Sequence, residues 1–307
     1  MTVSIQEVRS EREFRQFAEF PLSLYQNDPH YAPQLTRDLL NHFSGKNPFF
    51  LHGEARFFLA YRNNQIVGRI ASIINRLHNA YHNDKVGFFG FFESIDDQSV
   101  ADALLGTVTK DLRFRGLDTV RGPMNFSTNE EVGFLVDGFD DHPILMTPYT
   151  KRYYPALMEA AGYAKVKDLY AFLHDVEGAL PEKILRAAAI SEKRGITCRQ
   201  LTKGEFPMAM RAFKDIFNSA WSDNWGFVPI TDEEIEDSVR QLKPIINPDV
   251  MSLAFHNGEP VGFCGMVPDF NVVLQKMRGK INPVTICKAL YYKSRIRDLR
   301  MLLLGIK

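Results

Sequence analysis

The sequence predicts an α/β fold in which two related mixed-sheet domains follow one another. The first observation is its length, because 307 residues are about twice the length of an average domain. The second is an internal repeat: FFLAYRNNQIVG at 57–68 and MSLAFHNGEPVG at 251–262 correspond at a constant offset of 194 positions, with five identities in twelve. The patterns that precede the two segments also correspond. We therefore expect one domain over 1–176 and another over 177–307.

Each copy of the repeat has the pattern of a β-hairpin, with apolar strands on either side of an Asn-Asn or Asn-Gly turn. In the first domain a strand and an amphipathic helix precede the hairpin, and a third buried strand follows at 85–94. A helix then begins after Asp96 or Asp97, which can cap it, and ends at Gly116. The last expected elements are a strand at 118–126, a short helix at 150–162 and a strand at 164–176.

The second domain begins where Gly178 and Pro181 interrupt the pattern. Its expected elements, in order, are a helix at 181–195, a strand at 196–202, helices at 206–221 and 231–245, the hairpin at 251–270, a helix at 284–299 and an apolar strand at 300–307.

Composition argues against several classes of protein. Lys and Arg number 37 and Asp and Glu number 37, so zero net charge predicts neither a nucleic-acid nor a membrane partner. Charged residues in the first 14 positions argue against a signal peptide, which makes a cytoplasmic protein the expectation. Three cysteines are too few for a disulfide framework, and His78 and His82 lack the Glu of a zinc motif, so no metal is expected.

Four strings of the sequence indicate a family. The chain resembles the GNAT superfamily of acyl-CoA-dependent N-acyltransferases, and more closely a little-characterised bacterial group with two GNAT-like halves. The strings are ARFFLAYRNNQIVGRIASIIN (55–75), KVGFFGFFES (85–94), RGPMNFSTNEEVGFLVDGFD (121–140) and NSAWSDNWGFVPIT (218–231).

The resemblance implies that acyl-CoA, for example acetyl-CoA, is the cosubstrate and a small-molecule amine the acceptor. In such folds the pantetheine arm pairs with the third hairpin strand, and a Gly-rich loop at the next helix holds the pyrophosphate. The first copy lacks this loop, because IDDQSVADAL follows its third strand. Met158 replaces the usual Tyr of the last helix. Tyr153 and Tyr154 one turn earlier could substitute for it, although packing at a helix start is the favoured explanation for both.

The second copy stops on RMLLLGIK, the presumed pairing strand, so we expect it to be incomplete. By the resemblance, the backbone that would pair with the pantetheine arm is that of Leu303, Leu304 and Gly305.

Candidate catalytic and acceptor-binding residues follow strand ends. Glu93 closes the third strand, where some family members keep a general base, although a solvated strand end is the alternative. Polar residues that could hold an acceptor lie after the next strand and between two helices of the second copy, with turn formation or packing as the alternatives; they are Asn125, Ser127, Thr128, Asn224 and Trp225. The acidic loop around Glu130 and Glu131 has no metal-binding spacing and is expected to be solvated.

Three functions remain open from the sequence. The first is acyl transfer, most simply of an acetyl group, from CoA to an amine, in the second half with the first half shaping the acceptor site. The second is a non-catalytic binding module, which the missing phosphate loop and Met158 favour. The third is a Fem-like aminoacyl transferase, which would need a basic groove for tRNA.

Overall fold

A computed structural model describes residues 2–176, 178–242 and 247–307, so Glu177, where the second predicted domain begins, lies outside the described residues. The chain packs as two compact units, each of which takes residues from separate stretches of sequence. Unit 1 holds the chain up to Lys165 together with Gly226–Val228 and Asp269–Asp298, and unit 2 holds Val166–Trp225, Pro229–Pro268 and Leu299–Lys307.

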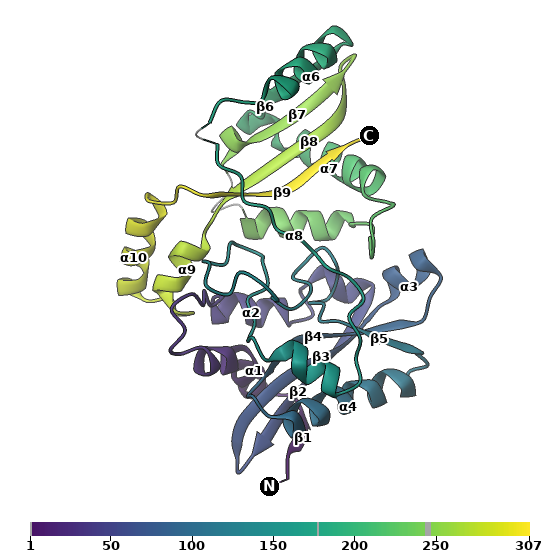
Figure 1. Ribbon diagram of the computed structural model, residues 1–307, viewed down its shortest axis with the longest axis vertical. Helices are drawn as coiled ribbons and strands as arrows, with labels where there is room; N and C mark the ends of the chain where they lie inside the picture. The colour runs from purple at the N-terminus through teal and green to yellow at the C-terminus, as the bar shows by residue number, and fades with distance from the viewer. Residues whose placement is uncertain (1, 177, 243–246) are drawn as a thin grey trace. The chain divides into compact units, whose positions relative to one another are not determined.

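Unit 1 is built on a five-stranded sheet in the order β1-β2-β3-β4-β5 (Figure 1). The first four strands are antiparallel, and β5 is parallel to the start of β4. This order confirms the succession of strands that the sequence predicts for the first copy as far as β5. The elements are β1 (Ser4–Glu7), α1 (Glu11–Leu24), α2 (Thr36–His42), η1 (Pro48–Leu51), β2 (Gly53–Arg62), β3 (Gln65–Asn75), α3 (Arg76–His82), β4 (Val86–Ser94), α4 (Gln98–Phe114), β5 (Thr119–Arg121), α5 (Tyr154–Ala160), α9 (Asn271–Met277) and α10 (Pro283–Lys293).

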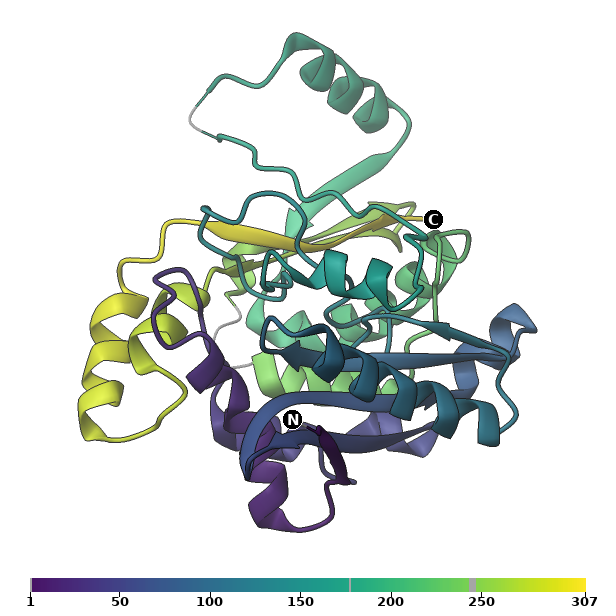
Figure 2. The same ribbon diagram turned by 60° about the horizontal axis from the view of Figure 1, so that its bottom comes forward.

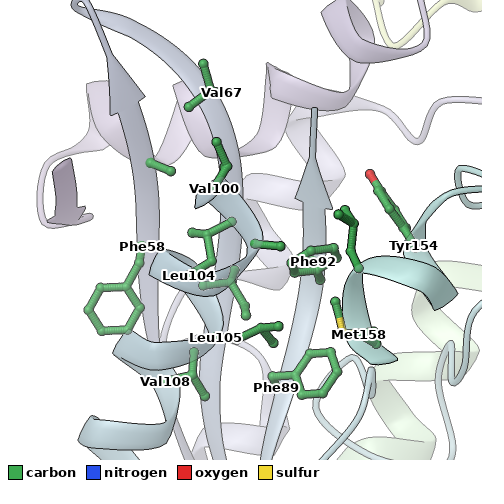
Figure 3. Close-up of a cluster of buried hydrophobic side chains, with 14 of the residues drawn as sticks. Phe58, Val67, Phe89, Phe92, Val100, Leu104, Leu105, Val108, Tyr154 and Met158 are labelled. Carbon is green, nitrogen blue, oxygen red and sulfur yellow. The ribbon is translucent and has the colours of Figure 1, made fainter. Parts of the chain in front are cut away.

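Two apolar cores lie on opposite faces of this sheet, because side chains alternate along each strand. Figure 3 shows one core, in which Leu104, Leu105 and Val108 of α4 face Phe89 and Phe92 of β4. The other core joins α1 and the loop after β5 to the opposite face; it includes Phe17, Phe57, Phe88, Phe91 and Phe126. The sheet of unit 1 is therefore the middle of three layers (Figure 2).

Unit 2 repeats the first part of this plan with a four-stranded antiparallel sheet in the order β6-β7-β8-β9. Its hairpin turn uses positive φ at Asn257 and Gly258, as the first hairpin does at Asn63 and Asn64. The elements are α6 (Glu182–Lys193), β6 (Ile196–Gln200), η2 (Lys203–Glu205), α7 (Phe206–Ala220), α8 (Asp232–Leu242), η3 (Pro248–Val250), β7 (Met251–His256), β8 (Glu259–Pro268) and β9 (Leu299–Ile306).

The register confirms the internal repeat. The first hairpin is irregular between Ala60 and Tyr61, and the second between Ala254 and Phe255, which is the same step at an offset of 194. A register shift also separates β3 from β4 and β8 from β9. Two copies of one supersecondary pattern therefore underlie the two units.

Three expectations about secondary structure are corrected. The strand expected at 164–176 does not form, and side chains such as Phe172 and Leu173 are over 85% exposed; alternation alone does not make a strand unless the segment also pairs with a neighbour and buries one face. The strand expected at 118–126 is only Thr119–Arg121, because Pro123 has no N–H to continue a ladder. The helix expected at 284–299 ends at Lys293. Of the helix expected at 231–245, residues 243–245 lie outside the described residues.

The connection between β8 and β9 contains two helices, of which α9 was not expected, and both pack on unit 1. Buried Asp269 accepts N–H groups of Leu145 and Asn271 at 3.0 and 3.3 Å, and the Asn271 side chain donates to Pro143 O at 2.7 Å. Thr36 N donates to Gly279 O at 3.2 Å. Within the described ranges, no helix is long and apolar enough to cross a membrane.

Candidate functional site

A buried carboxylate with several hydrogen-bond and charge partners, Glu93, lies at the end of β4 in unit 1. Glu93 is 8% exposed. Its Oε2 accepts hydrogen bonds from the hydroxyls of Tyr25 at 2.9 Å and Tyr154 at 2.6 Å, and Arg69 Nη2 lies 3.9 Å from Oε1. Glu93 is thus not the solvated residue at a strand end that the sequence left open as an alternative. Glu93 is a buried carboxylate with three partners.

Each partner comes from a different element. Tyr25 is the C-terminal cap of α1, and Tyr154 is the first residue of α5. Arg69 lies directly opposite Glu93 in the β3–β4 ladder, where its Nη1 also donates to Phe17 O at 2.8 Å. Four segments far apart in sequence therefore meet at this carboxylate.

Burial decides the protonation behaviour of this group. Burial raises the pKa of Glu93 above its ordinary value, and Arg69 and the hydroxyls of Tyr154 and Tyr25 offset part of that shift. Burial, followed by the nearby charge of Glu93, raises the pKa of both Tyr25 and Tyr154. The two hydroxyls therefore stay protonated, and Glu93 is a stronger proton acceptor than an exposed carboxylate.

A group of tyrosines extends this site away from Glu93. The Tyr25 ring stacks on Tyr31 with centroids 4.2 Å apart, and the Tyr149 ring lies 6.1 Å from Tyr25. Lys151 Nζ sits 4.1 Å from the centre of the Tyr25 ring and 3.7 Å from Asp28 Oδ2, and Tyr149 donates to the other oxygen of Asp28 at 2.9 Å. The ring of Tyr25 and the carboxylate of Asp28 thus bind the ammonium group of Lys151.

The Asn125 side chain is hydrogen-bonded to β4 at Phe91, two residues before Glu93. Phe91 adopts a positive φ of 50° where the β3–β4 register shifts, and its N–H donates to Asn125 Oδ1 at 2.7 Å. Asn125 Nδ2 in turn donates to Glu131 Oε2 at 3.3 Å, and Gln34 Nε2 donates to Oε1 at 3.3 Å. Of the predicted acceptor-binding residues, Asn125 is the one that the fold links to the strand of Glu93.

Glu131 is not the solvated loop carboxylate that we expected. Its side chain is partly buried, and burial, with the nearby charge of Glu130, raises its pKa to about 7. Glu130 itself lies 2.9 Å from His42 Nε2. Glu131, in the loop after β5, is thus a second carboxyl group of unit 1 with a raised pKa.

The other predicted acceptor-binding residues lie elsewhere. Buried Ser127 accepts the N–H of Asn129 at 3.1 Å, and Thr128 donates to Gly226 O at 2.7 Å, so both hydroxyls make bonds that hold loops of unit 1. Asn224 and Trp225 are exposed residues of unit 2.

The predicted pantetheine strand of unit 2 runs beneath α7. Leu303, Leu304 and Gly305 line an apolar cavity of about 10 Å³, which is at the lower limit for one water molecule. Trp221 Nε1 donates to Leu304 O at 3.1 Å, and Phe263 is the register partner of Gly305. By the repeat offset and the ladder, the Phe263–Gly305 pair of unit 2 stands where unit 1 has Arg69 and Glu93.

The start of α4 does not fit a pyrophosphate. Asp97 caps the helix by accepting the Ser99 N–H at 2.9 Å, and its other oxygen binds Arg62 at 2.8 Å. A carboxylate thus takes a helix N–H that a phosphate would need, as the sequence indicated. No group of three or more potential metal ligands occurs in the part of the chain that the structure describes.

Sequence reasoning missed Tyr25, Arg69 and Lys151. Arg69 had a signal, since it is the only charged residue of the apolar strand QIVGRIASIIN, and a charge in a buried strand calls for a partner. Tyr25 and Lys151 had none, because their contacts are long-range.

No protein-family model matches the sequence. Structural likeness to solved proteins is low: a tandem GNAT protein from the clavulanic acid biosynthesis pathway has a TM-score of 0.48 at 11% identity over 87% of this chain and 74% of that one. A glucosamine N-acetyltransferase region of a fungal multi-domain β-N-acetylglucosaminidase has a TM-score of 0.47 at 13% identity, over 87% of this chain and 28% of that one.

Sequence similarity to two bacterial proteins is much stronger. Protein YghO of Escherichia coli strain K12 is 32% identical over 300 residues, which are 97% of this chain and 77% of that protein. Bacterial ceramide synthase of Caulobacter vibrioides is 32% identical over 309 residues, which are 99% of this chain and 80% of that protein. The chain therefore belongs to the family that includes protein YghO and this bacterial ceramide synthase.

Proposed function

We propose that the chain is an acyl-CoA-dependent N-acyltransferase in which unit 1 provides the acid–base chemistry. The amine nitrogen of an acceptor attacks the thioester carbon, a C–N bond forms, the C–S bond breaks, and free CoA leaves as the thiol. One proton must leave the nitrogen in this sequence. The observation that supports the proposal is the buried Glu93, whose raised pKa and hydroxyl partners suit it to accept that proton.

The proton route follows from the hydrogen bonds. Oε2 of Glu93 accepts hydrogen bonds from the buried hydroxyls of Tyr25 and Tyr154, and we propose that Tyr25 relays the proton. The hydroxyl of Tyr25 takes a proton from the amine as it passes its own to Glu93. When CoA leaves as a thiolate, Glu93 returns the proton by the same path, which leaves the residues as they began.

The relative's name points to the class of substrates. A ceramide is the amide of a fatty acid with a long-chain amino alcohol, so by similarity we propose a long-chain acyl-CoA as donor and a long-chain amino alcohol as acceptor. We favour these long-chain substrates over the acetyl group considered from the sequence. The amine acceptor rests on this similarity, because Lys151 already occupies the ring face of Tyr25 and the carboxylate of Asp28.

For acyl-CoA itself we propose the β9 backbone of unit 2. The Asp97 cap argues against the start of α4 in unit 1 as the pyrophosphate site. In unit 2, a pantetheine arm would pair with Leu303, Leu304 and Gly305, and the indole of Trp221 would have to release the Leu304 carbonyl to admit it.

The test is turnover of a long-chain acyl-CoA with sphinganine, followed by thiol release and by mass spectrometry of the amide. Glu93→Gln should lower kcat by about 10²–10⁴-fold. Asp269→Asn is the matched control, because it also neutralises a buried carboxylate of unit 1 but one that holds α9. If Glu93→Gln turns over like wild type while remaining folded, Glu93 is not the base.

A non-catalytic binding module is the alternative, and the Asp97 cap is the observation that favours it. Under this alternative the protein binds a long-chain amine or acyl-CoA but forms no amide, whatever the chain lengths of the acyl-CoA and the amine. Specific amide formation that depends on Glu93 excludes it.

A further inference from the structure

Charge is strongly segregated in one segment of the chain. Between Phe270 and Arg297 the sequence has seven basic residues and no acidic residue, so the rest of the chain holds 30 basic against 37 acidic residues. The basic residues are Lys276, Arg278, Lys280, Lys288, Lys293, Arg295 and Arg297. The zero net charge of the whole chain conceals this segment, which forms α9, α10 and the turns beside them.

Helix α10 also exposes apolar side chains over most of its circumference. Only the stripe of Thr285, Ala289 and Tyr292 is buried or half-buried. Val284 is 65% exposed and Leu290 is 68% exposed; Ile286, Cys287 and Tyr291 are exposed as well. A helix that is apolar on nearly every side is normally enclosed by protein or lipid, so this surface calls for a partner.

The helix is firmly held in this exposed place. Figure 1 shows α9 between α10 and the helices α1 and α2 of the same unit. Asp269 and Asn271 tie α9 to the segment 143–145, and Thr36 holds Gly279 in the turn before α10. A capping box between Asn282 and Thr285 fixes the start of α10.

Basic and apolar groups are interleaved on this surface. The Arg295 guanidinium lies 4.0 Å from the centre of the Tyr291 ring, and Lys288 lies one turn from both Val284 and Tyr291. Aliphatic side chains that enter the acyl boundary, with cations at the level of the head groups, are what an anionic bilayer surface binds.

We propose that α10 and the basic residues around it form a docking surface for a membrane that contains anionic lipids. A second copy of the chain is a poorer partner, because seven positive charges would face seven others without an acid between them. A nucleic acid would use the charges but leave Val284, Ile286 and Leu290 against a polar surface. The lipid surface uses both features.

Docking here would place the acceptor site close to the bilayer. Gln275 of α9 donates to the carbonyl of Pro29, in the loop between Tyr25 and Tyr31. The docking surface therefore rests on the loop that carries the tyrosine stack. This consequence depends on the proposed function, whereas the docking surface itself does not.

The test is co-sedimentation of the full chain with vesicles of phosphatidylcholine alone and with about 30% phosphatidylglycerol. Wild type should bind the anionic vesicles and be released by about 0.5 M salt. Lys288→Gln should weaken binding about fivefold, and Val284→Ser with Leu290→Ser about tenfold or more. All three side chains are exposed, so an unchanged thermal unfolding curve is expected and checks the fold.

The matched control is Phe172→Ser with Leu173→Ser, which removes two exposed apolar side chains from a segment of balanced charge and should leave vesicle binding unchanged. Equal binding of wild type and the α10 variants overturns the proposal. The proposal is also overturned if the chain binds RNA or duplex DNA but no vesicles, and Lys288→Gln weakens that nucleic-acid binding. It is likewise overturned if the chain forms a dimer without lipid and the α10 variants dissociate that dimer. The α10 variants should acylate short-chain substrates that do not form micelles as fast as wild type does. This measurement distinguishes a failure of the docking proposal from a failure of the proposed function.

Discussion

Glu131→Gln should stabilise unit 1 at alkaline pH and leave it nearly unchanged at acidic pH. The folded pKa of Glu131 is raised to about 7, against an ordinary 4.5. Between these values the folded state keeps a proton that the unfolded state has lost, so stability falls as pH rises through this window. At about 1.4 kcal/mol per pKa unit the full effect is about 3 kcal/mol, and because water reaches part of the side chain we expect about 1–2 kcal/mol.

The hydrogen bonds around Glu131 permit the amide. Asn125 must keep its oxygen on the Phe91 N–H, so its Nδ2 still needs an acceptor, which Oε1 of a glutamine provides. Gln34 can turn its own amide to accept from the new NH₂ group. Loss of a hydrogen bond should therefore not mask the charge effect.

The readout should be hydrogen exchange of β3 and β4 amides at about pH 4.5 and pH 8.5. Tryptophan fluorescence would report the other unit, because both tryptophans, Trp221 and Trp225, belong to unit 2. Exposed Glu159→Gln on α5 is the control and should show no such pH dependence. An effect of Glu131→Gln that is equal at both pH values, or larger at pH 4.5, would refute the assignment of a protonated Glu131.

Four further substitutions have distinct expected outcomes. Burial lowers the pKa of His78 to about 4, so wild-type stability should fall by about 2–3 kcal/mol as pH drops from 6.5 toward 4, and His78→Leu should remove this loss in acid unfolding curves. Gly90→Ala should destabilise by about 3 kcal/mol, since its Cβ would meet a backbone oxygen, whereas Gly106→Ala on α4 meets nothing and should stabilise by about 0.5–1 kcal/mol in thermal unfolding. Tyr154→Phe removes a donor that favours ionised Glu93, so the acidic limb of the kcat profile should move to higher pH, and an unmoved limb would argue against Glu93 as the base.

The hairpins and most helices could be predicted because their signals are local. A turn of Asn-Asn or Asn-Gly and a 3.6-residue apolar period act over a few residues, and both copies contain them. The segment 164–176 has a local signal too, but a strand also needs to pair with another strand, and that pairing is not encoded within the segment. Its exposed side chains show that alternation was not sufficient here.

The site could be predicted only in part, for a related reason. Glu93 was identified from its place at a strand end, but Tyr25 and Tyr154 lie 68 and 61 residues away in sequence. Periodicity within a segment contains no information about contacts at that distance. The same limit applies to α10, since a charge count over the whole chain averages its basic residues with acids elsewhere.

The two copies of the repeat differ in chemistry where their ladders correspond. At one position of the ladder, unit 1 has the charged pair Arg69 and Glu93, and unit 2 has Phe263 and Gly305. A buried carboxylate with a raised pKa can move a proton, but its negative charge would repel the phosphates of an acyl-CoA. A glycine in an apolar strand cannot move a proton, but it keeps the backbone accessible to an amide-bearing arm. The corresponding position of the two ladders therefore differs in its chemistry, and of the two pairs only Arg69 and Glu93 contain an ionisable group.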